Sequence, residues 1–311
     1  MIQIDLITGF LGSGKTTFIR QYAKYLLGNG LNIGILENDF GAVNVDAMLL
    51  QDILGENCTL EMVAGGCDDD CHRRRFKTKL ISMGMCGYDR ILVEPSGIFD
   101  MDEFFDVLHE GPLDRWYEIG NVITIIDAGL RQNLSEASRY ILASQTAQAG
   151  AVIFSHTQET DKEQLTSTMN YINSSLEMLH CQKNPGQLII DKDWNSLSER
   201  DYKEIMSSGY YNAAYTKQWS DTKEKYDSLY FMNKDFSESF LMKSCSDILS
   251  DNTCGKVMRI KGFQMLPDGN WIAVNATHDN IDIHPVQNGQ AILIVIGEKL
   301  NRKSIENYWG A

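Results

Sequence analysis

Short apolar runs separated by polar, helix-like segments recur along roughly the first 195 residues of the chain. Each run is rich in Ile, Leu and Val and is followed by a turn and a helical segment. Near-continuous apolar strands of this kind are typical of a parallel sheet that helices cover on both faces. We therefore predict a doubly wound, mostly parallel α/β domain. Its predicted strands are IQIDLIT (2–8), NIGILEN (32–38), RILVEP (90–95), NVITIIDA (121–128), AVIFS (151–155) and QLIID (187–191).

The pattern changes twice in the rest of the chain. Residues 196–254 are polar and helix-like, and we predict a helix that begins at Ser237 or Glu238 and ends near Asn252. Beyond it, GKVMRIKGF, WIAV, IDIHPV and AILIVIG alternate as short strands around a turn at PDGN. We therefore expect a nucleotide-binding domain over 1–195, a connecting region over 196–254 and a small α+β domain over 255–311.

Charge and cysteine usage limit the possible partners and compartments. The 311-residue chain has 28 basic and 42 acidic side chains, a net charge of −14, which disfavours nucleic acid and anionic membranes as partners. Seven scattered cysteines are an odd number and favour a reducing compartment over a disulfide framework. The N-terminus lacks the pattern of an export signal, and no apolar run reaches the roughly 18 residues of a membrane span. We expect a folded cytoplasmic protein.

The segment GFLGSGKTT, residues 9–17, matches the phosphate-binding pattern G-x-x-x-x-G-K-[ST]. A predicted strand precedes it, and a segment with apolar residues on one helical face follows it. In this setting, backbone N–H groups and the helix N-terminus bind the phosphates of a nucleoside triphosphate. Lys15 is expected to reach the outer phosphates, and the Thr16 hydroxyl to bind Mg²⁺. The predicted binding residues are Gly9, Gly12, Ser13, Gly14, Lys15, Thr16 and Thr17.

A second carboxylate for the magnesium ion is expected at the end of the strand in DRILVEPSG. Glu94 ends this apolar run, and we predict that it acts on Mg²⁺ directly or through water. The alternative is an ordinary strand-end carboxylate. Gly97, three residues later, is the candidate whose N–H senses the γ-phosphate.

Taken in order, six segments of the chain resemble the CobW-like family of P-loop GTPases and metallochaperones. They are GFLGSGKTT, ENDFGAVNVD (37–46), GGC (65–67), LVEPSG (92–97), IIDAG (125–129) and GKVMRIKG (255–262). The resemblance implies a GTPase domain of P-loop NTPase type followed by a small α+β domain. It also implies Mg²⁺ and GTP as ligands, handling of Zn²⁺ or Co²⁺, and a client metalloprotein or corrinoid-related enzyme as partner. Asp39 stands in the first switch of the family pattern and is the candidate for coupling nucleotide to metal.

The family's metal motif, G-G-C-x-C-C, is altered in this chain. The corresponding stretch is AGGCDDDCHRRR, in which Cys67 is followed by three aspartates before the next thiol, Cys71. Thiolates, carboxylates and imidazole are all zinc ligands, whereas adjacent carboxylates favour harder ions. Cys67 and Cys71 are therefore candidate metal ligands. The alternative is two reduced thiols in a solvated acidic loop.

The family's guanine motif, N-K-x-D, is also altered. The aligned stretch AVIFSHTQE supplies Ser155, His156, Thr157 and Gln158 in its place. The Gln158 amide would turn its NH₂ toward the guanine NH₂, a mismatch worth about 1–3 kcal/mol. We therefore predict a weakened preference for GTP and consider ATP as the alternative nucleotide. If backbone contacts read guanine instead, Gln158 is incidental.

Three classes of function are compatible with these features. The first is a nucleotide-hydrolysing metal chaperone or insertion factor. The second is a nucleotide-dependent switch that docks on a client enzyme without carrying metal, and the third is a small-molecule P-loop kinase. Lys15, Thr16 and Glu94 would carry catalysis, and hydrolysis is expected to be slow because no side chain stands out as the group that positions water.

Overall fold

The computed structural model describes residues 1–39, 46–64, 69–97, 101–181, 184, 186–213, 226–232, 234, 236–287 and 289–310. The chain divides into two compact units, Met1–Gln218 and Trp219–Ala311. The stretch 196–254, predicted to connect two domains, contributes one helix to the first unit and a strand and a helix to the second. Of the helices that the structure describes, none combines the length and apolarity needed to cross a membrane.

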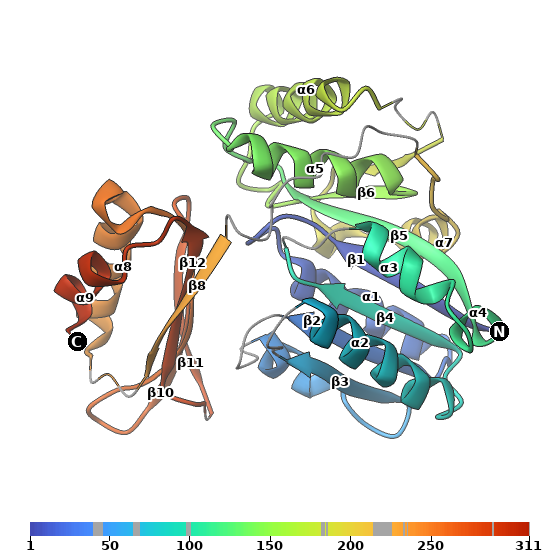
Figure 1. The fold of residues 1–311 in the computed structure, drawn as a ribbon, viewed down its shortest axis with the longest axis horizontal. Coiled ribbons are helices and arrows are strands. Elements are labelled where there is room, and N and C mark those ends of the chain that lie inside the picture. The colour runs from blue at the N-terminus through green and yellow to red at the C-terminus, as the bar shows by residue number, and fades with distance from the viewer. Residues whose placement is uncertain are drawn as a thin grey trace. The chain divides into compact units, whose positions relative to one another are not determined.

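The first unit is built on a seven-stranded parallel sheet in the order β3-β2-β4-β1-β5-β6-β7 (Figure 1). All six strands predicted from apolar runs are confirmed, and the doubly wound α/β fold with them. The edge strand β3 was not predicted. The strands are β1 (Ile2–Thr8), β2 (Ile33–Asp39), β3 (Cys58–Ala64), β4 (Arg90–Pro95), β5 (Tyr117–Asp127), β6 (Ala151–Ser155) and β7 (Leu188–Ile190).

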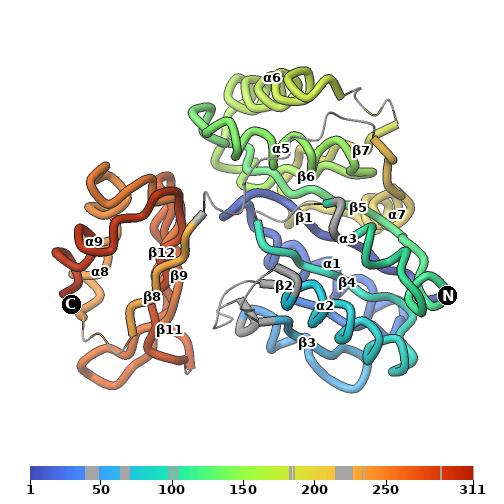
Figure 2. The backbone as a smooth tube through the Cα atoms, in the orientation of Figure 1, coloured from blue at the N-terminus to red at the C-terminus, as the bar shows by residue number. Residues whose placement is uncertain are grey.

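Helices cover both faces of this sheet, as Figures 1 and 2 show for α1 behind it and α2 in front. The apolar side of α1, with Phe18, Tyr22 and Leu26 fully buried, packs in one cluster with strand residues and with Ile205 of α7. The α1 face toward the sheet therefore follows the spacing expected of an amphipathic helix. The helices are α1 (Lys15–Gly28), α2 (Asp69–Gly84), α3 (Met101–Leu108), α4 (Leu113–Trp116), α5 (Glu136–Gln148), α6 (Lys162–Met178) and α7 (Glu199–Met206), with 3-10 turns at Asp46–Ile53 and Trp194–Ser196.

The second unit is a five-stranded antiparallel sheet in the order β11-β10-β9-β12-β8, with α8 and α9 against one face (Figure 2). The four predicted strands, the turn at PDGN and the predicted helix are confirmed; Ser237 caps α8 by accepting from the Phe240 N–H. The edge strand β8 was not predicted. The elements are β8 (Tyr226–Met232), α8 (Glu238–Ser250), β9 (Lys256–Met265), β10 (Trp271–Ala276), β11 (Ile281–Val286), β12 (Ile292–Glu298) and α9 (Arg302–Trp309).

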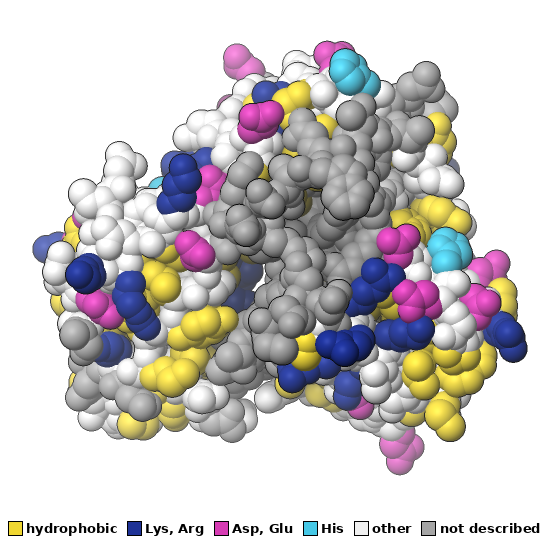
Figure 3. Space-filling model, in the orientation of Figure 1, with side chains coloured by type: hydrophobic (Ala, Val, Ile, Leu, Met, Phe, Trp, Pro, Cys, Tyr) yellow, Lys and Arg dark blue, Asp and Glu magenta, His cyan; other side chains and the backbone are white. Residues whose placement is uncertain are grey.

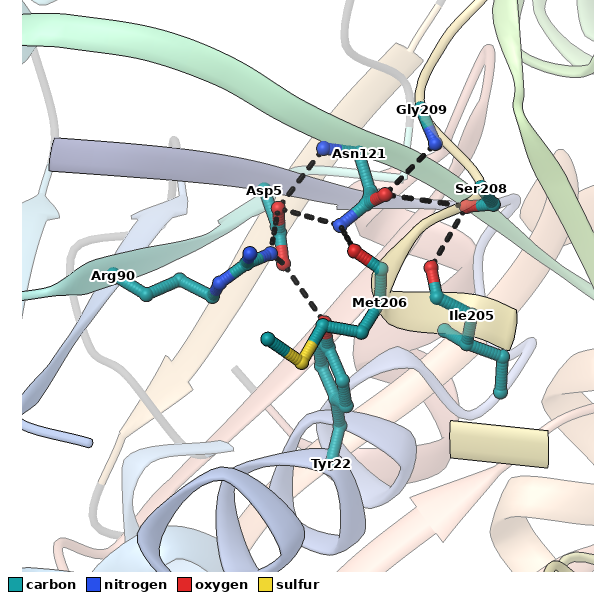
Figure 4. A network of polar contacts seen from close by, with 8 residues as sticks. All are labelled: Asp5, Tyr22, Arg90, Asn121, Ile205, Met206, Ser208 and Gly209. Carbon is teal, nitrogen blue, oxygen red and sulfur yellow. Dashed lines mark hydrogen bonds and ion pairs between the residues drawn. The ribbon is translucent and has the colours of Figure 1, made fainter. Parts of the chain in front are cut away.

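A buried ion pair lies in the middle of the parallel sheet (Figure 4). The Asp5 carboxylate on β1 accepts from Arg90 Nη1 of β4 at 2.6 and 2.7 Å and from the Tyr22 hydroxyl of α1 at 3.0 Å. The Asn121 backbone and side-chain amides each donate to Asp5 at 2.9 Å. Every oxygen of this fully buried carboxylate is thus satisfied, as a charge removed from water requires.

Asn121 extends the same network to the end of α7 (Figure 4). Its Nδ2 donates to the Met206 carbonyl at 3.1 Å, and its Oδ1 accepts from the Gly209 N–H at 2.8 Å. The network therefore joins three strands, α1 and the chain that leaves α7.

Candidate nucleotide-binding site

The loop between β1 and α1 has the backbone that its glycines permit. Gly9 and Gly14 both have positive φ, 145° and 91°. A Cβ on Gly9 would lie 2.2 Å from the Ile125 carbonyl oxygen, so a side chain is excluded there. Gly14 is the N-cap of α1, in the left-handed region that glycine adopts at least cost. The loop conformation therefore depends on the motif glycines.

Lys15 and the uncapped start of α1 give this loop its positive character. No side chain caps the helix and its first turn holds no acidic residue, so its N–H groups suit an anion. Lys15 is only 6% exposed, and its Nζ donates to the Gly9 carbonyl across the loop at 3.2 Å. The ammonium group is thus held beside the phosphate-binding backbone.

Thr16 and Glu94, predicted to act together on a magnesium ion, lie together. The Thr16 hydroxyl is 2.9 Å from both carboxylate oxygens of Glu94, and the two residues are 7% and 9% exposed. A hydroxyl and a carboxylate at the buried end of a strand are oxygen donors of the kind that Mg²⁺ prefers. The residues present therefore fit this ion.

A second carboxylate, Glu37, was missed in the sequence analysis. It is buried on β2 and lies beside Glu94 in the parallel register, so the two side chains share one face of the sheet. The signal was available, because NIGILEN ends its apolar run in an acid just as RILVEP does. Glu37 is a further candidate oxygen donor for a divalent ion.

Gly97 lies directly against the phosphate loop. A Cβ at this position would come within 2.8 Å of the Leu11 backbone nitrogen. The preceding Ser96 N–H donates to the Asn38 carbonyl at 2.9 Å, and Gln145 Nε2 of α5 lies 3.4 Å from the Gly97 carbonyl oxygen. The predicted phosphate-sensing segment is therefore placed between the loop and α5.

The stretch predicted to read the base follows β6. Ser155 is buried, and its Cβ lies 3.7 Å from the position a Cβ would take on Gly14, so this loop adjoins the phosphate loop. His156 has φ 53° and its Nδ1 lies 2.9 Å from Asp127 Oδ2. That hydrogen bond raises the pKa of His156 above its usual value. Gln158 is exposed. Its role in base reading stays a prediction.

The candidate metal ligands are only partly described. Cys67 lies outside the described residues, and so does the side chain of Asp39 at the end of β2. Cys71 is partly exposed on the first turn of α2, next to the buried His72. Basic side chains gather over α2 (Figure 3), where Arg73 and Lys77 both pair with Glu110 at 2.6 Å. Outside the undescribed stretches, no three His, Cys, Asp or Glu side chains form a metal-binding group.

The chain matches one family model and several known proteins. The family model of the CobW/HypB/UreG nucleotide-binding domain matches residues 3–180. "Zinc chaperone YeiR" of Escherichia coli is 30% identical over 164 residues, 52% of this chain and 49% of that protein. "Zinc chaperone YjiA" of Escherichia coli is 31% identical over 138 residues, 41% of each chain. The chain thus matches at most about half the length of these two relatives. The crystal structure of Zn(II)-bound YjiA GTPase from E. coli aligns with a TM-score of 0.39 at 18% identity, covering 99% of this chain and 97% of that one.

Proposed function

The chain belongs to the CobW/HypB/UreG nucleotide-binding domain family, and from this premise we propose that it is a nucleoside triphosphatase whose nucleotide cycle gates the delivery of a metal ion. The observation that carries the proposal is the buried contact of Thr16 with Glu94, 2.9 Å to each oxygen, directly after Lys15 in the phosphate loop. This contact joins the phosphate loop to the end of β4, where a nucleotide-bound ion would lie.

The phosphates would be held by the loop N–H groups and the start of α1, with Lys15 on the outer phosphates. Thr16 and Glu94 would hold Mg²⁺, with Glu37 next to them as a further donor. Mg²⁺ bound there would neutralise charge on the phosphates. Because no described side chain is placed as an evident water-positioning group, we expect slow hydrolysis.

Gating would act through the segment after β4. Gly97 packs against Leu11, and its carbonyl oxygen lies near the Gln145 amide. A γ-phosphate that contacted the Gly97 N–H would therefore alter both contacts. The first-switch residue Asp39, two residues after Glu37, ends β2 and would pass the same signal to the Cys67 segment. The bound nucleotide would thereby set the state of the metal-binding loop.

The cargo we propose is zinc, with cobalt as the alternative. Relatives with the same nucleotide-binding domain are named zinc chaperones. Cys67 and Cys71 would supply thiolates, and neighbouring carboxylates the remaining ligands. A client metalloprotein, or a corrinoid-related enzyme in the cobalt case, would receive the ion. The nucleotide is GTP or ATP, and Gln158 would weaken the preference for GTP.

Calorimetric titration tests the nucleotide part of this proposal. Lys15→Ala should weaken binding of both GTP and ATP by about tenfold or more, because a charge-assisted hydrogen bond is lost. Equal binding by the variant and the unaltered chain would refute the proposed site. GTP binding at least a hundredfold tighter than ATP binding would refute the weakened base preference.

Metal analysis tests the cargo. We expect stoichiometric zinc that depends on the nucleotide state and is lost in the double variant Cys67→Ala, Cys71→Ala. Cys86→Ala is the matched control, because Cys86 is an exposed thiol in the turn after α2. Zinc that is substoichiometric and unchanged in the double variant would refute metal delivery in favour of a switch without cargo.

A further inference from the structure

Trp194 contacts both the phosphate loop and the strand that leads into the base-reading stretch. It begins the 3-10 turn Trp194–Ser196 after β7 and is only partly exposed. A Cβ on Gly14 would lie 3.2 Å from Cη2 of its indole, and the ring meets Phe18 of α1 edge-on at 5.5 Å. The indole therefore packs on the end of the phosphate loop and on the first turn of the helix that follows it.

The polar edge of the same ring is bound to the strand that leads into the base-reading stretch. Trp194 Nε1 donates to the Phe154 carbonyl at 2.8 Å. β7 pairs with β6 only from Ala151 to Ile153, so the sheet ladder between them stops one residue before Phe154. The indole N–H therefore binds the first β6 carbonyl beyond the end of this ladder, that of Phe154, next to Ser155.

One side chain thus connects the phosphate loop with the end of β6, after which the proposed base-reading stretch begins. The phosphate loop ends at Gly14, and the stretch from Ser155 to Gln158 begins directly after the carbonyl that Trp194 binds. Asp193 fixes the turn itself, because its carboxylate accepts from the Asn195 N–H at 2.9 Å. When the spacing is set before binding, less free energy is spent on ordering the site around the ligand, so the affinity is higher.

We infer that Trp194 is a positioning residue that holds the base-reading loop at a set distance from the phosphate loop, and so raises affinity for a whole nucleoside triphosphate over its phosphate chain alone. The inference rests on the proposed nucleotide-binding function and adds a determinant of ligand class to it. A side chain that merely filled the apolar core would affect both ligand classes alike.

Titration of the full chain with GTP, ATP and inorganic tripolyphosphate, each with Mg²⁺, separates these cases. Trp194→Phe keeps an aromatic ring against Gly14 and Phe18 but removes the indole N–H. We expect nucleoside triphosphate binding to weaken about fivefold to tenfold, the effect of one hydrogen bond, while tripolyphosphate binding changes less than about twofold. Trp116→Phe is the matched control, because Trp116 ends α4 and directly precedes β5, at the N-terminal end of a strand, whereas the proposed site lies at the carboxyl ends of the strands.

Either an equal loss for both ligand classes or no loss for either would overturn the inference. If the unaltered chain bound neither class, the proposed function would fail and the inference with it; normal nucleotide binding by Trp194→Phe refutes the inference alone.

A second measurement covers the case in which Trp194→Phe does not fold. The chain has five tryptophans, so 5-fluorotryptophan labelling gives five ¹⁹F signals, and Trp→Phe variants at the other four identify the Trp194 signal by elimination. We expect this signal to shift with GTP or ATP and to move little with tripolyphosphate. An unmoved signal with bound nucleotide, or equal shifts with both ligand classes, would overturn the inference.

Discussion

Gly14 is a residue of the phosphate loop whose backbone conformation makes substitution unfavourable. Its φ of 91° lies in the left-handed region, and an added Cβ would meet Trp194 at 3.2 Å. We expect Gly14→Ala to lower the free energy of unfolding by about 1–2 kcal/mol, measured by urea denaturation, because an L side chain is strained in this region. It should also weaken nucleotide binding by displacing the loop.

The control for that substitution is Gly28→Ala at the last residue of α1, where an added Cβ meets nothing within 4 Å. It should be neutral or stabilise the fold by up to about 1 kcal/mol, because it reduces the freedom of the unfolded chain. Equal losses in the two variants would show that the backbone of Gly14 is not special.

His156 gives the first unit a pH-dependent contribution to stability. Its Nδ1 bonds Asp127 at 2.9 Å, and this raises the pKa of the imidazole above 6.5. A raised folded-state pKa means that the stabilisation is complete below about pH 6.5 and is lost as pH rises through the folded-state value. Because the His156 side chain is 37% exposed, we expect less than about 1 kcal/mol.

The variant His156→Asn tests this, since asparagine tolerates the φ of 53°. The excess stability of the unaltered chain over the variant, from urea denaturation, should be largest near pH 6 and shrink toward pH 8.5. His180→Asn reports the backbone effect alone, because His180 has the same φ at an exposed position. An excess that grew with pH would contradict the assignment of the proton to His156.

Single residues of the site were predictable where one motif fixes both the type and the backbone. Lys15, Thr16 and Gly14 follow from the phosphate-loop pattern, and Glu94 from an acid at the end of an apolar strand. The structure brings Thr16 and Glu94 together. Glu37 was missed although it too is an acid at the end of an apolar run, since only the register of β2 with β4 shows that it lies beside Glu94.

At the scale of elements, the buried Asp5 network holds β1, β4 and β5 to one another. Asp5→Asn would leave the Arg90 guanidinium, 8% exposed, without its counter-charge. We expect the free energy of unfolding to fall by about 3–5 kcal/mol in urea denaturation, the usual effect of breaking a buried pair.

Two further variants test whether the loss comes from the unpaired buried charge. Asp52→Asn, in an exposed pair with Arg20, should cost below about 1 kcal/mol. Replacing the buried pair together, Asp5→Leu with Arg90→Met, should recover much of the loss, because no buried charge is then left unpaired. A double variant no more stable than Asp5→Asn would show that the surrounding hydrogen bonds dominate.

Sequence patterns predicted the interior strands of both sheets and also two edge strands, β7 and β11. Central strands such as β4 and β6 are buried along their whole length and read as unbroken apolar runs. The two missed strands are at sheet edges: β3 carries Glu61 and the 44% exposed Met62, and β8 carries Asp227 and Ser228. One side of an edge strand faces solvent instead of a neighbouring strand, so its sequence can carry polar residues that interrupt the apolar run.

At the scale of the whole molecule, the two units close separate apolar cores. The division at Gln218 was not predicted, because α7 and β8 belong to different units but both fall in the stretch 196–254, which was interpreted as one connecting region. The predicted site residues from Gly9 to Gln158 all belong to the first unit. Nucleotide binding should therefore act on the stability of that unit.

Calorimetric unfolding checks this expectation. Saturation with nucleotide at about 100 times the dissociation constant should stabilise the first unit by about 2.7 kcal/mol and leave the transition of the second unit in place. A Lys15→Ala chain should show no such shift. One cooperative transition that moved as a whole would contradict independent units.

The Asp5 network also bears on how the protein is made. Asp5 leaves the ribosome well before its partner Asn121, which follows 116 residues later. Asn121 in turn waits for Gly209, a further 88 residues along. At about 5–20 residues per second, the hydrogen bonds of this network can therefore be completed only about 10–40 s after Asp5 is made. During that interval the nascent chain would depend most on chaperones. A chain that ended before α7 would lack the hydrogen bonds of Asn121 with Met206 and Gly209.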